Sequence, residues 1–412
     1  MKVLGVIVEY NPFHVGHLHH LKTSKELTNA EYVVAVMSGN FVQRGEPAII
    51  DKFARAEMAL KAGVDVVFEL PTIYAIQDAS GFASGSIGML NATNVVTDVV
   101  FGSETNDVDN LSRIADIILE EPFAYRQFLK KYLKEGFSFP NARRYALCDM
   151  MPELDSETIK QSNNILGVEY MVALKKMKSQ IKAHTIKRIG ASYNDENISS
   201  IPSATAIRKA IAEKRELKEI KGLPDFSLEI LERELENGRG PIFLNDLFEI
   251  FKFKMLMLSR EGLENLYGFN EGMAKRMIDN LDRSHVEEFL KLVKTKRFTL
   301  TRIRRRILYA LLDVTRNLVL DSNEYGPQYL RVLGFRERGR KVLRDISKHS
   351  SIPIISNVSG FNRAIEKRNV YMPLAKEQMN LDIKATDMYS MLFKRKKERK
   401  MHRDFKKVLI ER

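Results

Sequence analysis

The first 220 residues alternate between short apolar runs and longer stretches with helical periodicity, and this pattern limits the possible folds more than any other feature. Short apolar runs rich in β-branched residues are typical of strands that are buried on both faces of a parallel sheet. Strands separated by helices predict an α/β domain with a doubly wound parallel sheet and right-handed crossovers. We expect strands at residues 3–8, 32–37, 64–70, 95–101 and 181–189, and helices at residues 51–62, 108–119, 122–133 and 164–178.

The pattern changes after Gly222, where helical periodicity continues without regularly spaced apolar runs. A β-branched run at residues 352–355 favours one strand, and the residues from Asp387 onward predict a strongly basic helix. This break in periodicity predicts a division into residues 1–220 and residues 221–412. We expect the second part to be mainly helical, with helices at residues 226–235, 241–254, 271–280, 284–293, 301–320 and 329–348.

The formal net charge of +13 on the 412 residues is unevenly distributed. Residues 1–220 hold 26 Lys and Arg against 27 Asp and Glu, whereas residues 221–412 hold 40 against 26. A solvated helical surface would explain any one basic cluster, but four clusters in one segment favour nucleic acid, because each neutralised phosphate releases condensed counterions. The clusters are Lys291, Lys294, Lys296 and Arg297; Arg302, Arg304, Arg305 and Arg306; Arg331, Arg336, Arg338, Arg340 and Lys341; and residues 394–400.

The rest of the composition excludes several classes of protein. A single cysteine, Cys148, rules out a disulfide framework and a Cys-rich zinc or iron–sulfur site, and it suits a reducing compartment. Glu9 interrupts the first apolar run too early for a signal peptide, and no run of about 18 apolar residues could span a membrane. We therefore expect a cytoplasmic protein that does not enter the membrane, and the sequence indicates no obligate protein partner.

Four of the eight histidines fall within residues 14–20, where the first predicted strand gives way to a helix. His14 and His17 are three residues apart, so both lie on one face of the first turn, and Gly16 leaves room for a ligand beside the backbone. A helix N-terminus binds anions, and two imidazole donors there can stabilise a phosphoryl group during its transfer. A metal site would need further ligands from elsewhere, and a surface helix would explain any one histidine alone.

A second segment, residues 203–208, has the sequence Ser-Ala-Thr-Ala-Ile-Arg and would begin a helix at the end of the α/β region. Ser203 follows Pro202 as a good N-cap, and Thr205 and Arg208 fall within the next two turns. Serine and threonine cap helices in many proteins, so this segment alone is a weak indication of function. It becomes a strong indication in combination with the histidine motif.

Together the two segments resemble the signatures of the HxGH nucleotidyltransferase superfamily, which has a Rossmann-like sheet. The resemblance implies that His14 and His17 stabilise the transition state at the α-phosphate of ATP. It also implies that Ser203, Thr205 and Arg208 hold the β- and γ-phosphates. The first signature reads Asn11-Pro12-Phe13-His14-Val15-Gly16-His17 in this chain.

Longer segments resemble one family within that superfamily, the bacterial tRNA(Met) cytidine acetate ligases. The most specific is residues 37–48, Met-Ser-Gly-Asn-Phe-Val-Gln-Arg-Gly-Glu-Pro-Ala. This resemblance implies an ATP-dependent ligase that forms N4-acetylcytidine at the wobble position of elongator tRNA(Met). Acetate and ATP would form an acetyl-adenylate, and the products would include AMP and pyrophosphate. Further matching segments are residues 68–71, 101–104, 162–166 and 330–335.

The resemblance places most ATP contacts after the strands, which is where ligands bind to an open parallel sheet. Mg²⁺ is expected only as the usual partner of the ATP phosphates. The implied ATP-binding residues are Ile7, Val8, Glu9, Tyr10, Asn11, Pro12, Phe13, His14, Val15, Gly16, His17, Leu18, His19, His20, Gly102, Asn163, Lys187, Arg188, Ser203, Thr205 and Arg208. For the tRNA we expect contacts from Arg302, Arg304, Arg305, Arg306, Arg336 and Arg338.

Two other functions compete with this one. An adenylyltransferase that acts on a small phosphorylated cofactor precursor would share the ATP site, but it would not need a second part with a net charge of +14. An RNA-binding protein with an inactive nucleotidyltransferase domain would not need the intact His14, Gly16, His17 and Arg208.

Overall fold

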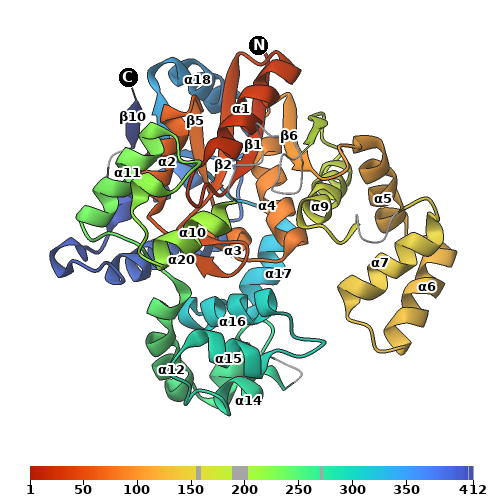
Figure 1. Ribbon diagram of the computed structural model, residues 1–412. Coiled ribbons are helices and arrows are strands. Elements are labelled where there is room, and N and C mark those ends of the chain that lie inside the picture. Colours follow the sequence, from red (N-terminus) through yellow and green to blue (C-terminus); the bar gives the residue numbers. More distant parts are fainter. Residues whose placement is uncertain (155–158, 188–202, 270–271, 407, 412) are drawn as a thin grey trace.

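The computed structural model describes residues 1–154, 159–187, 203–269, 272–406 and 408–411, which surround a central sheet (Figure 1). Within these residues the sheet has eight strands, and a separate antiparallel hairpin consists of β3 (Phe41–Val42) and β4 (Glu46–Pro47). The five strands expected from the first half are all present. The sheet contains β1 (Val3–Val8), β2 (Tyr32–Ser38), β5 (Val66–Leu70), β6 (Asp98–Ser103), β7 (Lys182–Lys187), β8 (Leu330–Arg336), β9 (Ile354–Ile355) and β10 (Leu409–Glu411).

The strand order confirms the doubly wound sheet. The five strands of the first half are parallel and lie in the order β5-β2-β1-β6-β7. The chain therefore moves outward from β1 to β5 and then crosses over to β6, so the order reverses between β1 and β6. Open parallel sheets bind ligands at such a reversal, beyond the carboxyl ends of the strands. The histidine motif follows β1 and lies at that position.

Both faces of the sheet are buried, as apolar strands require. Alternate residues of a strand point to opposite faces, so Val3 and Val34 pack into one core and Leu4 and Val33 into the other. The second core is covered by α1 (Val15–Thr28), α2 (Lys52–Lys61) and α11 (Asp225–Glu236), and the first by α4 (Ala79–Ala92) and α9 (Ser162–Lys176).

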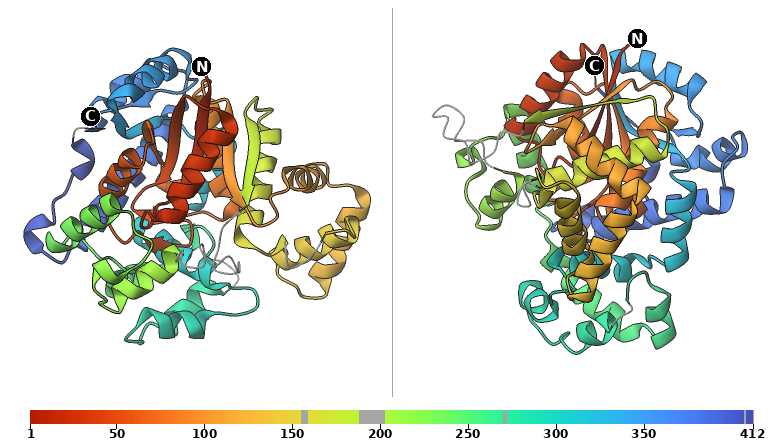
Figure 2. Two further views of the ribbon diagram at one scale, coloured as in Figure 1. Left: turned by 45° about the horizontal axis from the view of Figure 1, so that its top comes forward. Right: turned by 90° about the vertical axis from the view of Figure 1, so that its right-hand side faces the viewer.

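Two groups of helices extend beyond the sheet (Figures 1 and 2). We call residues 122–150 the arm; it contains α6 (Phe123–Lys134) and α7 (Phe139–Met150) and follows α5 (Val108–Glu120). We call residues 248–312 the helical lobe; it contains α12 (Phe248–Met257), α13 (Arg260–Asn265), α14 (Met273–Ile278), α15 (Val286–Val293) and α16 (Leu300–Leu312). The other helices are α3 (Thr72–Ala75), α10 (Ala204–Ala212), α17 (Arg316–Tyr325), α18 (Arg340–His349), α19 (Phe361–Glu366) and α20 (Met372–Met391).

The structure corrects three of the helices expected in the second half. Residues 329–348 form strand β8 followed by α18, because the apolar run that starts at Leu330 completes the sheet beside β5 instead of facing a helical core. Residues 301–320 form two helices: Asp313 adopts φ 56° and ends α16, and Thr315 then caps α17. The tail beyond α20 contains no further α-helix among its described residues, and it ends in β10.

The second half of the chain completes the sheet of the first half. Strand β8 pairs antiparallel with β5, while β9 and β10 pair parallel with β8. Three strands from residues 221–412 thus share one sheet with five strands from residues 1–220. The described residues include no helix that is both long enough and apolar enough to cross a bilayer.

Four buried charged side chains hold this extension in place. Lys52 at the start of α2 contacts Glu69 of β5 at 2.7 Å and Asp404 of the tail at 2.8 Å. Arg331 of β8 contacts both carboxylates at 2.9 Å. All four side chains are at most 4% exposed, so each charge depends on its partners in place of water. This charge cluster ties β5, β8, α2 and the tail together.

We expect Lys52→Met to lower the free energy of unfolding by about 3–5 kcal/mol, because it leaves two buried carboxylates with only one cation. The matched control is Arg113→Met, which removes a cation from an exposed pair with Glu153 whose side chains are 58% and 50% exposed. That loss should stay below about 1 kcal/mol. Urea denaturation measures both, and equal losses would show that burial of the cluster contributes nothing.

Candidate active site

The histidine motif forms the junction between β1 and α1. His14 is the N-cap of α1, and its Nδ1 accepts a hydrogen bond from the N–H of Gly16 at 3.1 Å. The Nδ1 of His17 accepts one from the N–H of His14 at 3.2 Å. The two imidazoles thus satisfy backbone donors at the helix N-terminus in the manner of a capping box, and the helix direction directs positive partial charge toward this point.

The same hydrogen bonds fix the ring tautomers. Because Nδ1 is an acceptor in both His14 and His17, each neutral imidazole carries its proton on Nε2. The two rings stack with centroids 3.8 Å apart, and Tyr10 contacts the His17 ring at 5.0 Å. The sequence prediction that the two histidines share one face is therefore confirmed, and both rings offer an Nε2–H donor.

Residues from the second half support this junction from behind. The N–H of Val15 donates to the carbonyl of Gly222 at 2.9 Å, and the Ser227 hydroxyl donates to the carbonyl of Phe13 at 2.8 Å. Phe226 also packs on the Phe13 ring at 5.5 Å. The motif is thus held between the sheet and the start of α11.

Arg208 brings the second sequence segment to the first. Its Nη1 donates to the carbonyl of Asn11 at 2.8 Å, and its Nη2 donates to the Thr205 hydroxyl at 3.3 Å. Ser203 caps α10 by accepting from the N–H of Ala206 at 3.2 Å. Burial lowers the pKa of Arg208, while Glu46 and Glu9 oppose that shift. The structure therefore joins two motifs that are almost 200 residues apart in the sequence.

Glu9 ties the β3–β4 hairpin to the end of β1. Its Oε1 accepts from the N–H of Gln43 at 2.8 Å and from the Ser38 hydroxyl at 3.3 Å. Burial raises the pKa of the Glu9 carboxyl, and the Gln43 N–H and the nearby arginines 55, 208 and 44 act in the opposite direction. Arg55 is fully buried and donates to the carbonyls of Glu9 and Gly39.

Glu46, next to the turn of the hairpin, connects residues 203–208 with the helical lobe. One carboxylate oxygen contacts Arg208 Nη2 at 3.8 Å, and the other is paired with Arg304 of α16. Arg305 donates to the carbonyl of Gln43 at 3.3 Å. Gly45 adopts φ 78°, and a Cβ there would lie 2.5 Å from the backbone nitrogen of Arg305, so α16 packs directly on the hairpin.

The end of β6 contributes a second group of polar residues. Apart from Gly102 itself and its two chain neighbours, no heavy atom of the described residues lies within 4 Å of the position that a Cβ would take at Gly102. A ligand could therefore approach the backbone at this residue. The amide of Asn163 donates to Glu104 at 2.6 Å, and Glu104 also accepts from the N–H of Asn164 at 2.8 Å. Asn164 in turn accepts from the Ser103 hydroxyl at 2.7 Å. The segments 101–104 and 162–166 thus meet at the start of α9.

Sequence reasoning missed two carboxylates that organise this region, Glu46 and Glu104. Both lie within segments that carried the family resemblance, but nothing in their spacing shows which groups they would bind. Lys187 ends β7 and is exposed, and Arg188 lies outside the described residues.

Burial and the neighbouring His19 lower the pKa of His20 to about 4, so His20 is neutral near pH 7. Among the described residues, no three His, Cys, Asp or Glu side chains gather into a metal-binding group.

The arginines expected to bind tRNA do not form one surface. Arg304 and Arg305 contact the hairpin, as described above, and Arg306 is buried and donates to the carbonyl of Gly268 at 3.1 Å. Arg336 and Arg338 contact Asp65, which precedes β5, and therefore lie at the opposite end of the sheet from the histidine motif. Arg302 packs on the Phe298 ring at 5.2 Å.

Comparisons with known proteins agree with this geometry. The chain matches the HIGH Nucleotidyl Transferase family over residues 1–404. It is 49% identical to the tRNA(Met) cytidine acetate ligase of Fervidobacterium nodosum, with 100% of this chain and 99% of that protein covered. The corresponding protein of Thermotoga maritima is 48% identical, with 97% of each chain covered.

A solved structure extends the agreement to three dimensions. The crystal structure of Thermotoga maritima TmcAL bound with alpha-thio ATP has a TM-score of 0.94 and 47% identity to this chain, and both chains are covered completely. The apo crystal structure of the same protein has a TM-score of 0.95. On these grounds, and with both of its signature motifs assembled at one site, the chain belongs to the tRNA(Met) cytidine acetate ligase family of the HIGH nucleotidyltransferases.

Proposed function

We propose that this protein is an ATP-dependent ligase that joins acetate to the wobble cytidine of elongator tRNA(Met) and so forms N4-acetylcytidine. The observation that carries the proposal is the hydrogen bond from Arg208 to the carbonyl of Asn11, which unites the two motifs at the reversal point of the sheet. The relatives named tRNA(Met) cytidine acetate ligase match the chain from end to end. ATP, acetate and tRNA are available together in the cytoplasm, where we place the reaction.

In the first step, an acetate oxygen attacks the α-phosphorus of ATP, and the bond to pyrophosphate breaks. The Nε2–H groups of His14 and His17 donate to the α-phosphate oxygens, whose negative charge grows in the transition state. Arg208, with Ser203 and Thr205, binds the departing pyrophosphate. Mg²⁺, where bound, would neutralise negative charge on the ATP phosphates and would be held mainly by those phosphates, since such sites usually use few protein carboxylates.

The remaining ATP contacts follow from the same placement. The backbone of residues 7–20 passes beneath the phosphates, and Gly102 leaves space for the nucleoside. Asn163 lies at the start of α9, and Lys187 is the last residue of the neighbouring strand β7. Arg188 is the next residue in the sequence and lies outside the described residues.

In the second step, the N4 amine of cytidine attacks the acetyl carbonyl carbon. The new C–N bond forms as the bond between that carbon and the adenylate oxygen breaks, and the amine loses a proton to solvent while AMP departs. Because adenylate is a good leaving group, orientation of the two reactants can supply about 7–11 kcal/mol of the required acceleration. We assign that orientation to residues 221–412 and the chemistry to residues 1–220.

The direct test is to incubate the protein with ATP, labelled acetate and total tRNA. The proposal expects label in tRNA as N4-acetylcytidine, with AMP and pyrophosphate released in equal amounts. Adenylylated small molecules would instead indicate a cofactor adenylyltransferase, and RNA binding without turnover would indicate an inactive domain; either result would exclude the proposal.

Substitution of either motif histidine should stop the first step without unfolding the site. His14→Asn keeps an N-cap acceptor for α1 but removes the ring donor, so we expect acetate-dependent ATP–pyrophosphate exchange to fall about 10²–10³-fold. His17→Ala should reduce it similarly. The melting temperature and tRNA affinity should stay close to those of the unmodified protein. His349→Asn, in the distant helix α18, is the matched control and should leave exchange unchanged. Normal exchange in both motif variants would contradict the role of the histidines.

Arg304 should affect the first step although it lies on the helical lobe. Arg304→Glu places a carboxylate against Glu46, which also contacts Arg208. Hydrogen bonds to charged groups contribute about 1.5–3 kcal/mol, so we expect pyrophosphate exchange to slow about tenfold or more. The control is the double variant Lys294→Glu and Lys296→Glu, whose exposed side chains lie in the same lobe. It should keep normal exchange, and equal exchange rates in the two variants would contradict the coupling through Glu46.

A further inference from the structure

The arm has a charge that differs from that of the half of the chain to which it belongs. Its residues 122–150 hold six Lys and Arg against two Asp and Glu, a net charge of +4. Residues 1–220 have a net charge of −1, so the rest of that half is acidic. The charge summed over residues 1–220 therefore conceals the basic character of the arm.

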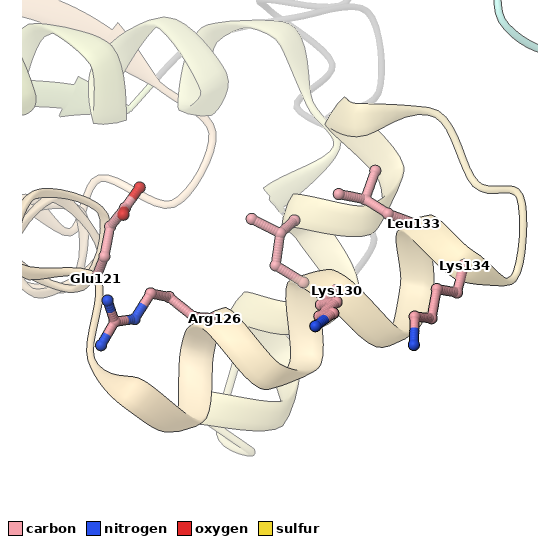
Figure 3. A pocket seen from close by; sticks show the side chains of 6 residues that line it. Glu121, Arg126, Lys130, Leu133 and Lys134 are labelled. Carbon is pink, nitrogen blue, oxygen red and sulfur yellow. The ribbon is translucent and has the colours of Figure 1, made fainter.

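Three cations of the arm form a stripe along α6. Arg126, Lys130 and Lys134 follow one another at intervals of four residues, which places them on one face about 6 Å apart. Figure 3 shows their side chains along one side of the helix, together with Leu133, and Glu121 at the end nearest Arg126. Within the described residues, none of the three forms an ion pair. By contrast, Arg143 on α7 is paired with Glu169 at 2.8 Å.

Aromatic side chains of the arm are also exposed. Phe137, in the turn after α6, is 38% exposed, and its ring lies 6.0 Å from that of Tyr132 and 5.1 Å from that of Tyr145, measured between centroids. Phe139, the first residue of α7, is 55% exposed, and Phe123 at the start of α6 is 70% exposed. Exposed aromatic rings between cations are the combination that RNA-binding surfaces use, because unpaired bases stack on the rings while the cations bind phosphates.

The arm is attached to the body of the protein and lies toward the end of the sheet that carries the histidine motif. Tyr125, Ala142 and Ala146 of the arm are buried, Tyr125 and Ala146 belong to the same hydrophobic core as α9, and the Arg143–Glu169 pair links the arm to α9. The arm and the helical lobe both extend beyond the carboxyl ends of the parallel strands, where the histidine motif lies, whereas α18 lies at the other end of the sheet (Figures 1 and 2).

We propose that the arm is a second RNA-binding surface, which binds the phosphate backbone of the tRNA through Arg126, Lys130 and Lys134 while Phe137 and Phe139 contact unpaired bases. This inference rests on the proposed function, since it assigns a further contact to the same substrate. RNA is favoured over an anionic membrane because the three cations form a line along a helix, whose spacing suits successive phosphates of one strand. A membrane-binding helix would instead carry a broad apolar face.

The test compares two triple charge reversals in the full-length protein. The arm variant is Arg126→Glu, Lys130→Glu and Lys134→Glu. The matched control is Lys341→Glu, Arg344→Glu and Lys348→Glu, which reverses three exposed cations on α18 at the far end of the sheet. Binding of elongator tRNA(Met) is measured by fluorescence anisotropy over a range of salt concentrations, and acetate-dependent pyrophosphate exchange is measured without tRNA.

We expect the arm variant to bind tRNA about tenfold or more weakly at ~0.1 M salt, with a salt dependence reduced by about two to three counterions. The tRNA affinity of the control variant should fall by less than half as much as that of the arm variant. Pyrophosphate exchange should be normal in both variants. Phe137→Ala with Phe139→Ala should weaken binding but leave the salt dependence unchanged, because stacking releases no counterions.

Several outcomes would overturn the inference. Equal tRNA affinity for the arm variant and the unmodified protein would do so, as would equal losses in the two triple variants, since a general change in charge would then explain them. Loss of pyrophosphate exchange in the arm variant would show that the arm serves the adenylate step. Binding of the unmodified protein to vesicles of phosphatidylserine and phosphatidylcholine, lost in the arm variant while tRNA affinity is kept, would assign the stripe to a membrane.

Failure of this inference can be told apart from failure of the proposed function. If the unmodified protein acetylates tRNA and the arm variant does so with the same KM for tRNA, only the inference fails. If the unmodified protein transfers no acetyl group to any tRNA, the proposed function fails.

Discussion

The buried charge cluster of Lys52, Glu69, Asp404 and Arg331 is the interaction on which the arrangement of the two halves depends. Two cations and two carboxylates balance one another in a place that excludes water. Because each charge would be costly without its partners, β8 and the tail must return to β5 and α2. Arg55 lies one turn after Lys52 in the same helix and connects α2 to the candidate active site. Its side chain donates hydrogen bonds to the carbonyls of Glu9 and Gly39.

The sequence predicted the parts of the fold that local patterns control. Apolar runs marked the five parallel strands, and the histidine motif marked the anion-binding end of α1. Residues 329–348 were predicted wrongly because a strand buried inside a large sheet and a buried helix can both be apolar. Only the long-range pairing of β8 with β5 decides between them, and a local pattern contains no information about that pairing. Asp313 is similar: its left-handed backbone separates α16 from α17, but aspartate is not a strong breaker by itself.

Only those parts of the candidate site that belong to the family motifs could be predicted from the sequence. His14, His17 and Arg208 lie together as expected, whereas the roles of Glu46 and Glu104 became visible only through their partners. The basic clusters show the limit of counting charges. Arg304, Arg305 and Arg306 belong to one of the four clusters in the sequence, but contacts within the protein engage all three. A cation that already has a partner has less to offer a phosphate, so pairing matters as much as net charge for locating an RNA surface.

The position of Glu46 gives this pairing a functional consequence. Its carboxylate contacts Arg208, which we assign to the phosphates of ATP, and Arg304, which belongs to the helical lobe. If α16 moved so that Arg304 left Glu46, this carboxylate would contact Arg208 alone. A displacement of Arg208 would likewise change the contact between Glu46 and Arg304 of α16. Such shared contacts are reciprocal by thermodynamic necessity. The lobe that we assign to the tRNA is therefore in direct contact, through one carboxylate, with a residue that we assign to ATP.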